Sequence, residues 1–214
     1  MKLYHGSKSG IVGAIRPISR EVCDFGRGFY MGTEATQPLT LICNRENPKF
    51  YTCEFNLSDL RVYSFEPTVE WAMFIAWNRK LIPEPFKEYY DAKFMSILRD
   101  NDVIVGKIAN DRMVMVLDWY FKQFISDVGM LESLKALNLG EQYCAITDTA
   151  CNRVKIVEER TLSRTECDNL VIKSENQRRT ALKTVDRIRM FHRKDGEGFY
   201  ERMARETGVK IDAT

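Results

Sequence analysis

The sequence predicts an α+β fold, in which short strands and inserted helices follow one another without regular strand–helix–strand alternation. Three observations predict it. Runs of β-forming residues recur through residues 1–160, helical patterns of apolar residues lie between them, and the rest of the chain indicates helix alone. With 214 residues the chain is long enough for a full hydrophobic core. We therefore expect one α+β domain over residues 1–160 and a basic helical extension over residues 161–214.

Four strands and two helices are expected in the first part of the chain. The strand-like runs are KLYHGS (2–7), GFYMGT (28–33), KFYTCEFNL (49–57) and RVYSF (61–65). The third run alternates apolar and polar residues, which predicts a half-buried strand. A helix is predicted over 34–45, with Pro38 in its first turn, and a second over 68–80, opened by Pro67. The second helix has one apolar face, formed by Val69, Met73, Ala76 and Trp77.

The second part of the chain moves from strands to helices. DVIVGKIA (102–109) predicts a buried strand, and DRMVMVLDWYFKQFI (111–125) an amphipathic helix. Residues 142–160 predict two strands around a polar turn. A basic helix follows over 176–194, and a short helix over 199–208 closes at Gly208. The basic helix has apolar residues at threefold spacing: Leu182, Val185, Ile188 and Phe191.

Charge is unevenly distributed along the chain. The formal net charge is only +2, but the segment Arg178–Lys194 carries seven basic residues and one acid, so the remainder is net negative. Three interpretations of this segment stay open. It forms a solvated helix face, the commonest outcome for a run of charges, it contacts nucleic acid phosphates, or it docks an acidic protein partner.

The cysteine pattern and the apolar runs bear on metal sites and location. Six cysteines are present without a C-x-x-C motif or a histidine cluster, so neither a zinc site nor any other metal is expected. We expect reduced thiols. The sequence shows no apolar signal-peptide core and no run long enough to span a membrane. The expectation is a cytoplasmic protein, or one delivered elsewhere without a cleavable signal, that has no membrane contact.

The stretch DFGRGFYMGT (24–33) excludes two familiar functions. Asp24-Phe25-Gly26 matches the metal-binding tripeptide of protein kinases, but the chain has no H-R-D catalytic loop. Gly26, Gly28 and Gly32 have the spacing G-x-G-x-x-x-G, which differs from the dinucleotide fingerprint, and β-forming residues rather than a helix follow. The glycine-spaced loop therefore needs another explanation.

Three short motifs in order supply one. YHGS (4–7), GRGFYMGT (26–33) and EQYCAI (141–146) together resemble the histidine–tyrosine branch of the ADP-ribosyltransferases, which includes diphtheria toxin and the poly(ADP-ribose) polymerases. Adding EWAMFIAWNR (70–79) and DVIVGKIANDRM (102–113), the chain resembles a bacterial toxin-associated family of transferase-like domains over residues 2–158. The resemblance implies a split antiparallel β-sheet core with inserted helices, NAD as co-substrate, and a protein or nucleic acid acceptor.

The resemblance also implies site residues. His5, Tyr30 and Gln142 match its three catalytic positions. The histidine would hydrogen-bond a ribose hydroxyl and the tyrosine would stack on nicotinamide, while glycines let the backbone approach the ligand. The residues expected to bind NAD are Tyr4, Gly6, Ser7, Gly26, Gly28, Phe29, Thr33 and Arg112. Asn110 and Asp111 are alternatives to Arg112 at the rim of the cleft, or they cap a helix.

The third motif departs from the family pattern. Gln142 stands where the family has glutamate, so hydrogen bonding is kept and the charge is lost. Glu141 precedes it, and neighbouring side chains on a strand point to opposite faces, so only one of the two can serve the site. The departure favours transfer of a single ADP-ribose over chain elongation. It also leaves two alternatives: an inactive module that binds through the transferase fold, or a nucleic-acid-binding protein acting through its basic helix.

Overall fold

The structure is a computed structural model and describes residues 1–107, 111–137 and 140–210. The strands in these ranges are β1 (Lys2–Ser7), β2 (Phe29–Gly32), β3 (Lys49–Phe55), β4 (Val62–Ser64), β5 (Val103–Lys107), β6 (Glu141–Ala145) and β7 (Val154–Thr161). The helices are α1 (Thr36–Ile42), α2 (Val69–Asn78), α3 (Glu84–Asp100), α4 (Asp111–Phe121), α5 (Asp127–Leu137), α6 (Asp148–Cys151), α7 (Arg164–Phe191) and α8 (Phe199–Thr207).

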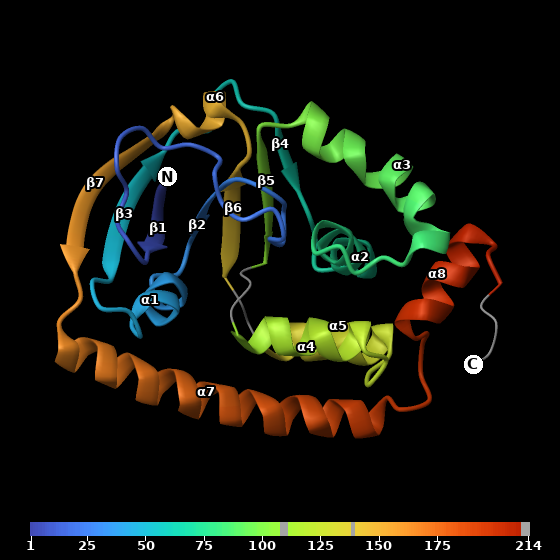
Figure 1. Cartoon of the computed structure of the whole chain (residues 1–214). Coiled ribbons are helices and arrows are strands. Elements are labelled where there is room, and N and C mark those ends of the chain that lie inside the picture. The colour runs from blue at the N-terminus through green and yellow to red at the C-terminus, as the bar shows by residue number, and fades with distance from the viewer. Residues whose placement is uncertain (108–110, 138–139, 211–214) are drawn as a thin grey trace.

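The strands form one open mixed sheet in the order β4-β5-β6-β2-β1-β3-β7 (Figure 1). β4 and β5 run parallel, and the other neighbouring pairs in the described sheet are antiparallel. The α+β fold class is therefore confirmed, and each predicted strand coincides with an observed one. Residues 142–160 show two further features: the turn between β6 and β7 contains α6, and these two strands lie in different parts of the sheet.

The sheet narrows where β1 meets β2. Only one pair of residues, Tyr4 and Gly32, lies in register between these strands. By contrast, six pairs join β1 to β3 and four join β2 to β6. The sheet therefore consists of two well-paired parts, β4-β5-β6-β2 and β1-β3-β7, connected through a short junction.

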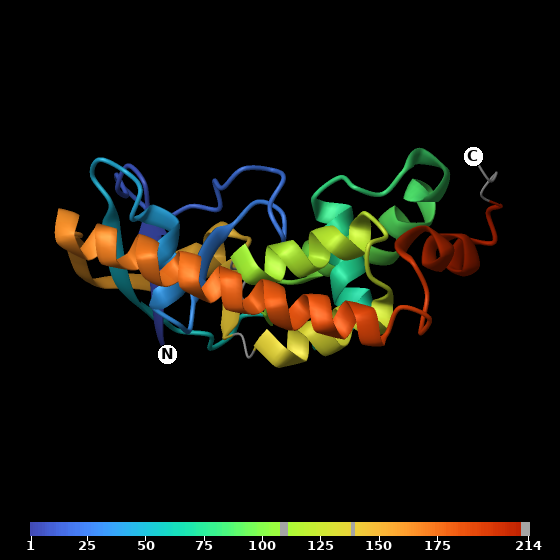
Figure 2. The same cartoon turned by 90° about the horizontal axis from the view of Figure 1, so that it is seen from below.

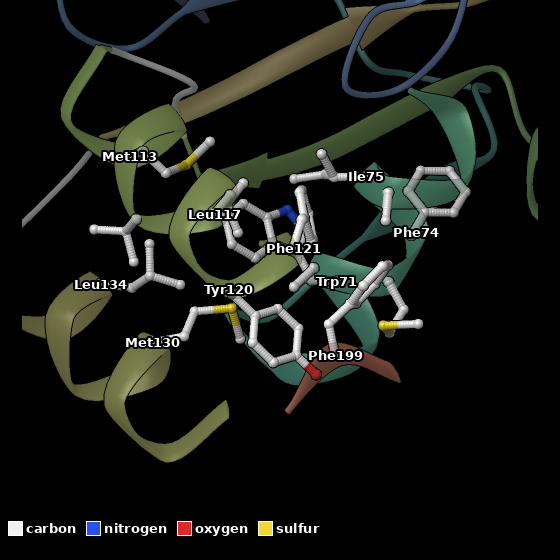
Figure 3. Close-up of a cluster of buried hydrophobic side chains, with 14 of the residues drawn as sticks. Trp71, Phe74, Ile75, Met113, Leu117, Tyr120, Phe121, Met130, Leu134 and Phe199 are labelled. Carbon is white, nitrogen blue, oxygen red and sulfur yellow. The ribbon is translucent and has the colours of Figure 1, made fainter. Parts of the chain in front are cut away.

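The largest core cluster lies between β5 and β6 and a layer of helices (Figure 3). α2 is its centre, and apolar side chains are buried on most sides of this helix rather than on one face, with Glu70 exposed. Met73 and Ala76 of the predicted face are buried, and Val69 and Trp77 pack against the cluster while partly exposed. Trp71, Phe74 and Ile75 lie outside that face and are fully buried as well, because helices on several sides cover α2. Such a helix is typical of a core position.

Two helices in this layer have no counterpart among the predicted elements. α3 begins after Pro83 with a second proline, Pro85, in its first turn, and buries Phe86, Tyr90 and Phe94 at intervals of four residues. α5 packs against α4 and α7. Pro85 together with the four-residue spacing is the sequence signal that could have predicted α3.

Two smaller clusters complete the core. One contains Leu3, Phe29 and Met31 and is covered in part by Ile11 and Ile15 of the loop between β1 and β2. The other joins α1 and α7 to the β1-β3 part of the sheet. β3 is buried on both faces over most of its length, so the half-buried strand predicted there was wrong. Its position between β1 and β7, with clusters on either side, accounts for this.

α7 runs along α1, α4 and α5 as one long helix (Figures 1 and 2). Its buried side chains are Cys167, Ala181 and Val185. Leu182 and Phe191 of the predicted apolar face are exposed, the latter by 79%. The true contact face is therefore narrower, and small or β-branched residues form it.

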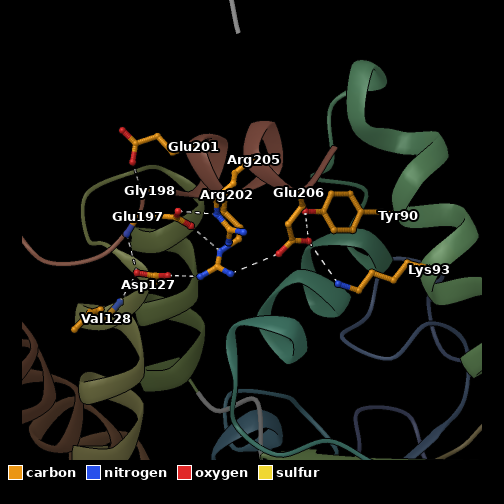
Figure 4. A network of polar contacts seen from close by, with 10 residues as sticks. All are labelled: Tyr90, Lys93, Asp127, Val128, Glu197, Gly198, Glu201, Arg202, Arg205 and Glu206. Atoms are coloured by element: carbon orange, nitrogen blue, oxygen red, sulfur yellow. Dashed lines mark hydrogen bonds and ion pairs between the residues drawn. The ribbon is translucent and has the colours of Figure 1, made fainter. Parts of the chain in front are cut away.

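α8 completes the main core and is held by polar contacts. Phe199 and Met203 are buried in the large cluster, and Gly208 ends the helix in the left-handed conformation, as predicted. Arg202 forms ion pairs with Asp127 and with Glu197 (Figure 4). At the other end of α8, the Tyr90 hydroxyl donates to Glu206 at 3.1 Å. The segment after residue 161 thus supplies side chains to the large core cluster that it shares with residues 1–160.

None of the helices in the described ranges combines the length and the apolar character that crossing a bilayer requires.

Candidate functional site

Tyr30 closes the glycine-spaced loop that precedes β2. Its hydroxyl donates to the carbonyl of Gly26 at 2.6 Å and accepts from the amide of Phe25 at 3.0 Å. The two aromatic rings stack with centroids 6.4 Å apart. Burial raises the pKa of Tyr30 well above its ordinary value, so the hydroxyl keeps its proton as a donor. The loop is therefore shaped by the side chain that the sequence assigns to ligand stacking.

The C-terminal end of α2 also contacts the glycine-spaced loop before β2. Arg79, just after α2, pairs with the Asp24 carboxylate at 2.6 Å, and both side chains are largely buried. Asn78 lies against Gly26, whose φ of 75° is in the left-handed region. Burial raises the pKa of Asp24, and the Arg79 guanidinium opposes that rise. Asn78 and Arg79 were not predicted as site residues, although both lie in the stretch 70–79 that carries part of the family resemblance.

The backbone at Gly28 lies so close to β6 that there is no room for a side chain at this position. A Cβ atom at this position would overlap the Sγ atom of Cys144 and would come within 3.0 Å of the Ala145 carbonyl. The Gly28 amide donates to the hydroxyl of Ser19 at 3.0 Å. The glycine thus lets the loop pass directly over β6, which explains its presence without reference to a ligand.

His5 connects β1 to β2 at the narrow junction of the sheet. Its Nδ1 atom lies 2.7 Å from the Tyr30 carbonyl oxygen, and its ring stacks on Phe29 at 4.3 Å between centroids. Burial lowers the pKa of His5, which favours a neutral ring with Nδ1–H as the donor. The imidazole thus takes the place of a backbone hydrogen bond between strands that hardly pair.

Gln142 lies in the middle of the sheet, on the side of the large core. It is 5% exposed, and its Nε2 atom has no hydrogen-bond partner among the described residues. Gly32 of β2 and Gly106 of β5 face it on either side. Glu141 is exposed and lies on the opposite face with Tyr143, whose hydroxyl is 3.4 Å from its carboxylate. Of the two neighbouring residues, the interior position therefore belongs to Gln142.

The three expected catalytic residues lie on adjacent strands but on two faces of the sheet. Phe29 and Tyr30 are consecutive, so their side chains point to opposite faces, and the His5 ring packs with Phe29. Tyr30 and Gln142 share the face of the large core: Tyr30 lies opposite Cys144, two residues beyond Gln142. The structure thus brings Tyr30 and Gln142 together and links His5 to them through the β2 backbone.

The remaining expected ligand contacts are arranged around these strands. Tyr4 stacks on Phe50, and a Cβ atom at Gly6 would lie 2.7 Å from the Pro38 carbonyl of α1. The Ser7 hydroxyl donates to the Gly10 carbonyl at 3.1 Å. Thr33 exchanges hydrogen bonds with Glu141: its amide donates to the Glu141 carbonyl and its hydroxyl accepts from the Glu141 amide, both at 2.9 Å.

The rim position predicted for 110–112 is described only in part. Arg112 is partly buried in α4. Asn110 lies outside the described residues, as does the side chain of Asp111. Over the ranges that the structure covers, no group of three or more His, Cys, Asp or Glu side chains is placed to hold a metal ion. The six cysteines form no disulfide.

The fold and site define a mixed α/β protein with an open seven-stranded sheet and a glycine loop secured to the end of α2. The chain belongs to the family described as Protein of unknown function (DUF3990), whose model matches residues 1–156. The match ends within β7, so α7 and α8 lie beyond it. No curated protein and no solved structure matches the chain.

Proposed function

We propose that the protein is an NAD-dependent mono-ADP-ribosyltransferase. The observation that carries the proposal is the meeting of three distant motifs on the adjacent strands β1, β2 and β6, where His5 bonds the Tyr30 backbone and Tyr30 shares a face with Gln142. The family resemblance supports the activity, and the narrow β1/β2 junction suits the split sheet that it implies. A toxin or effector role is part of the same proposal.

The reaction would break the bond between nicotinamide and ribose in NAD. Nicotinamide leaves with the electrons of that bond, the acceptor forms a bond to the anomeric carbon, and the acceptor's proton is released. Gln142 would hydrogen-bond the ribose, and Tyr30 would support the nicotinamide ring with its outer face while its hydroxyl keeps the loop closed. His5 would set the spacing of β1 and β2 through its bond to the Tyr30 carbonyl.

The uncharged amide of Gln142 is consistent with transfer of one ADP-ribose and no further addition to it. A carboxylate at this place would stabilise positive charge on the sugar and activate a ribose hydroxyl as the next acceptor. An amide can orient the hydroxyl but does not remove its proton. We therefore propose transfer of one ADP-ribose to a protein or nucleic acid, without chain elongation.

Labelled NAD tests this function. Purified protein is incubated with labelled NAD and separate pools of cell protein, RNA and DNA. We expect label in one pool, and a loss of about 10²–10³-fold in Gln142→Met, which keeps the side-chain volume and removes the hydrogen bonds. Circular dichroism checks that this variant is folded. Absence of both transfer and nicotinamide release from the folded wild-type protein would contradict the proposal and favour an inactive binding module.

The exposed face of α7 favours a second, compatible function: contact with nucleic acid. Arg179, Lys183 and Arg187 are exposed and recur every four residues, so they form one basic row along the helix. We expect binding to duplex DNA or RNA that weakens steeply with salt, and replacement of these three residues by glutamine to reduce the slope of log K against log salt by about 3. An unchanged slope would leave an acidic protein partner, such as an antitoxin, as the alternative.

A further inference from the structure

Two neighbouring buried hydrogen-bond donors on the sheet side of the large core have no partner among the described residues. They are the indole Nε1–H of Trp71 and the Nε2 amide of Gln142, in side chains that are 0% and 5% exposed. A third group of this core without a partner in the described ranges, the Tyr120 hydroxyl, lies on the side of α8, near Arg202. Leaving a buried donor unpaired costs about 1–3 kcal/mol, and folded proteins contain few of them. Two such groups in one region therefore require an explanation.

Gly106 places these two donors near each other. It faces Gln142 directly in the β5–β6 register, and a Cβ atom built on it would lie 2.8 Å from Trp71 Nε1 and 2.8 Å from the Cζ atom of Phe25. The absence of a side chain at Gly106 is what allows the indole nitrogen to reach the strand. Residues directly opposite in an antiparallel pair have Cα atoms about 4.5–5.5 Å apart. Trp71 and Gln142 thus present their N–H groups from neighbouring positions on the same face of the sheet.

The N–H group of Trp71 is not explained by packing. Phenylalanine residues supply most of the large buried rings of this cluster, including Phe74, Phe121 and Phe199 (Figure 3), and a phenylalanine at position 71 would be apolar without an unpaired donor. Trp77, six residues further along α2, shows the usual arrangement: its Nε1–H donates to the Asp91 carboxylate at 2.6 Å. The same helix therefore carries one tryptophan with a partner and one without.

We propose that Trp71 is a substrate-binding residue, whose Nε1–H donates, together with the Gln142 amide, to an oxygen acceptor of the ligand. This inference rests on the proposed function. On that basis, the ligand group is an uncharged oxygen of the nicotinamide–ribose half of NAD. Two donors on the sheet face, with Tyr30 beside them on β2, suit a carbonyl or hydroxyl oxygen adjacent to an aromatic ring.

NMR of the indole N–H groups tests this contact. The chain has three tryptophans, so ¹⁵N-labelled protein gives three indole signals, and Trp71→Phe identifies the one from Trp71. Nicotinamide mononucleotide and AMP, the two halves of NAD, serve as separate probes. We expect nicotinamide mononucleotide to shift the Trp71 signal in a saturable manner and AMP to leave it unchanged. The Trp77 signal, already bonded to Asp91, is the internal control.

Affinity measurements supply the second readout. Trp71→Phe is expected to weaken binding of nicotinamide mononucleotide about tenfold, the effect of one lost hydrogen bond. Trp77→Phe, which removes a donor that already has a protein partner, is expected to leave the affinity unchanged. Both variants are first checked for a native far-ultraviolet circular dichroism spectrum and a cooperative urea transition.

The outcomes separate this inference from the proposed function. If nicotinamide mononucleotide or NAD binds with no shift of the Trp71 signal and no loss in Trp71→Phe, the inference is wrong and the proposed function stands. A buried water between the two donors would give that result. If neither ligand binds to the wild-type protein, the inference and the proposed use of NAD both fail.

Discussion

Arg79→Met is expected to lower the free energy of unfolding by about 3–5 kcal/mol, because it leaves the Asp24 carboxylate buried without its partner. Asp24 is 8% exposed, and its guanidinium partner lies 2.6 Å away. Methionine keeps much of the length and apolar contact of the arginine stem. The loss is measured by urea denaturation followed by far-ultraviolet circular dichroism.

Two further variants show that the pair itself is responsible. Lys80→Met changes the next residue along the chain, whose ion pair with Glu21 is exposed, and no measurable change is expected. Asp24→Asn combined with Arg79→Met removes the uncompensated charge, so the double variant is expected to regain part of the loss. If Arg79→Met and Lys80→Met behaved alike, the buried pair would not be what secures the loop.

Gly28→Ala is expected to cost about 3 kcal/mol, near the upper end of the range for an overpacked interior. The added methyl group would overlap Cys144 Sγ and approach the carbonyl of Ala145. Either β2 must move away from β6, or the loop before it must open. Denaturation of the purified variant measures the cost, and the Tyr30 hydrogen bonds make a loop rearrangement visible in its near-ultraviolet spectrum.

A double-mutant cycle identifies the source of the clash. Cys144→Ala removes the Sγ atom, so Gly28→Ala is expected to cost less in that background than in the wild type. Cys144→Ala alone measures the cavity that the truncation leaves. Additive effects of the two substitutions would mean that Cys144 does not set the approach of the loop.

The strands were easier to predict than the helices around them. Each strand-like run has β-branched or aromatic residues in a short segment bounded by turn residues, and all seven occur. The burial of α2 was predicted only in part, since a single sequence does not reveal that α3, α4 and α8 cover the helix on several sides. The exposure of Leu182 and Phe191 has a related cause: spacing alone does not show which stripe of α7 faces the body of the protein.

In the candidate site, too, the motifs could be predicted from the sequence, whereas their three-dimensional arrangement could not. The motifs around His5, Tyr30 and Gln142 could be located from residue types and order, because glycines and aromatics mark them. The face of the sheet to which each side chain points could not be predicted. It depends on the register between β1 and β2, which a single residue pair, Tyr4 and Gly32, defines. The supporting ion pair of Asp24 and Arg79 joins residues 55 positions apart and has no local signature.

The position of α8 has a consequence for how the protein is made. The helix supplies Phe199 and Met203 to the core and reaches back to Tyr90, 116 residues earlier. A ribosome therefore has to deliver the chain beyond Met203 before the apolar surfaces of α2, α3 and α4 are fully covered. Until then those surfaces face water or a chaperone, and we expect nascent chains that stop before Phe199 to aggregate or to be degraded.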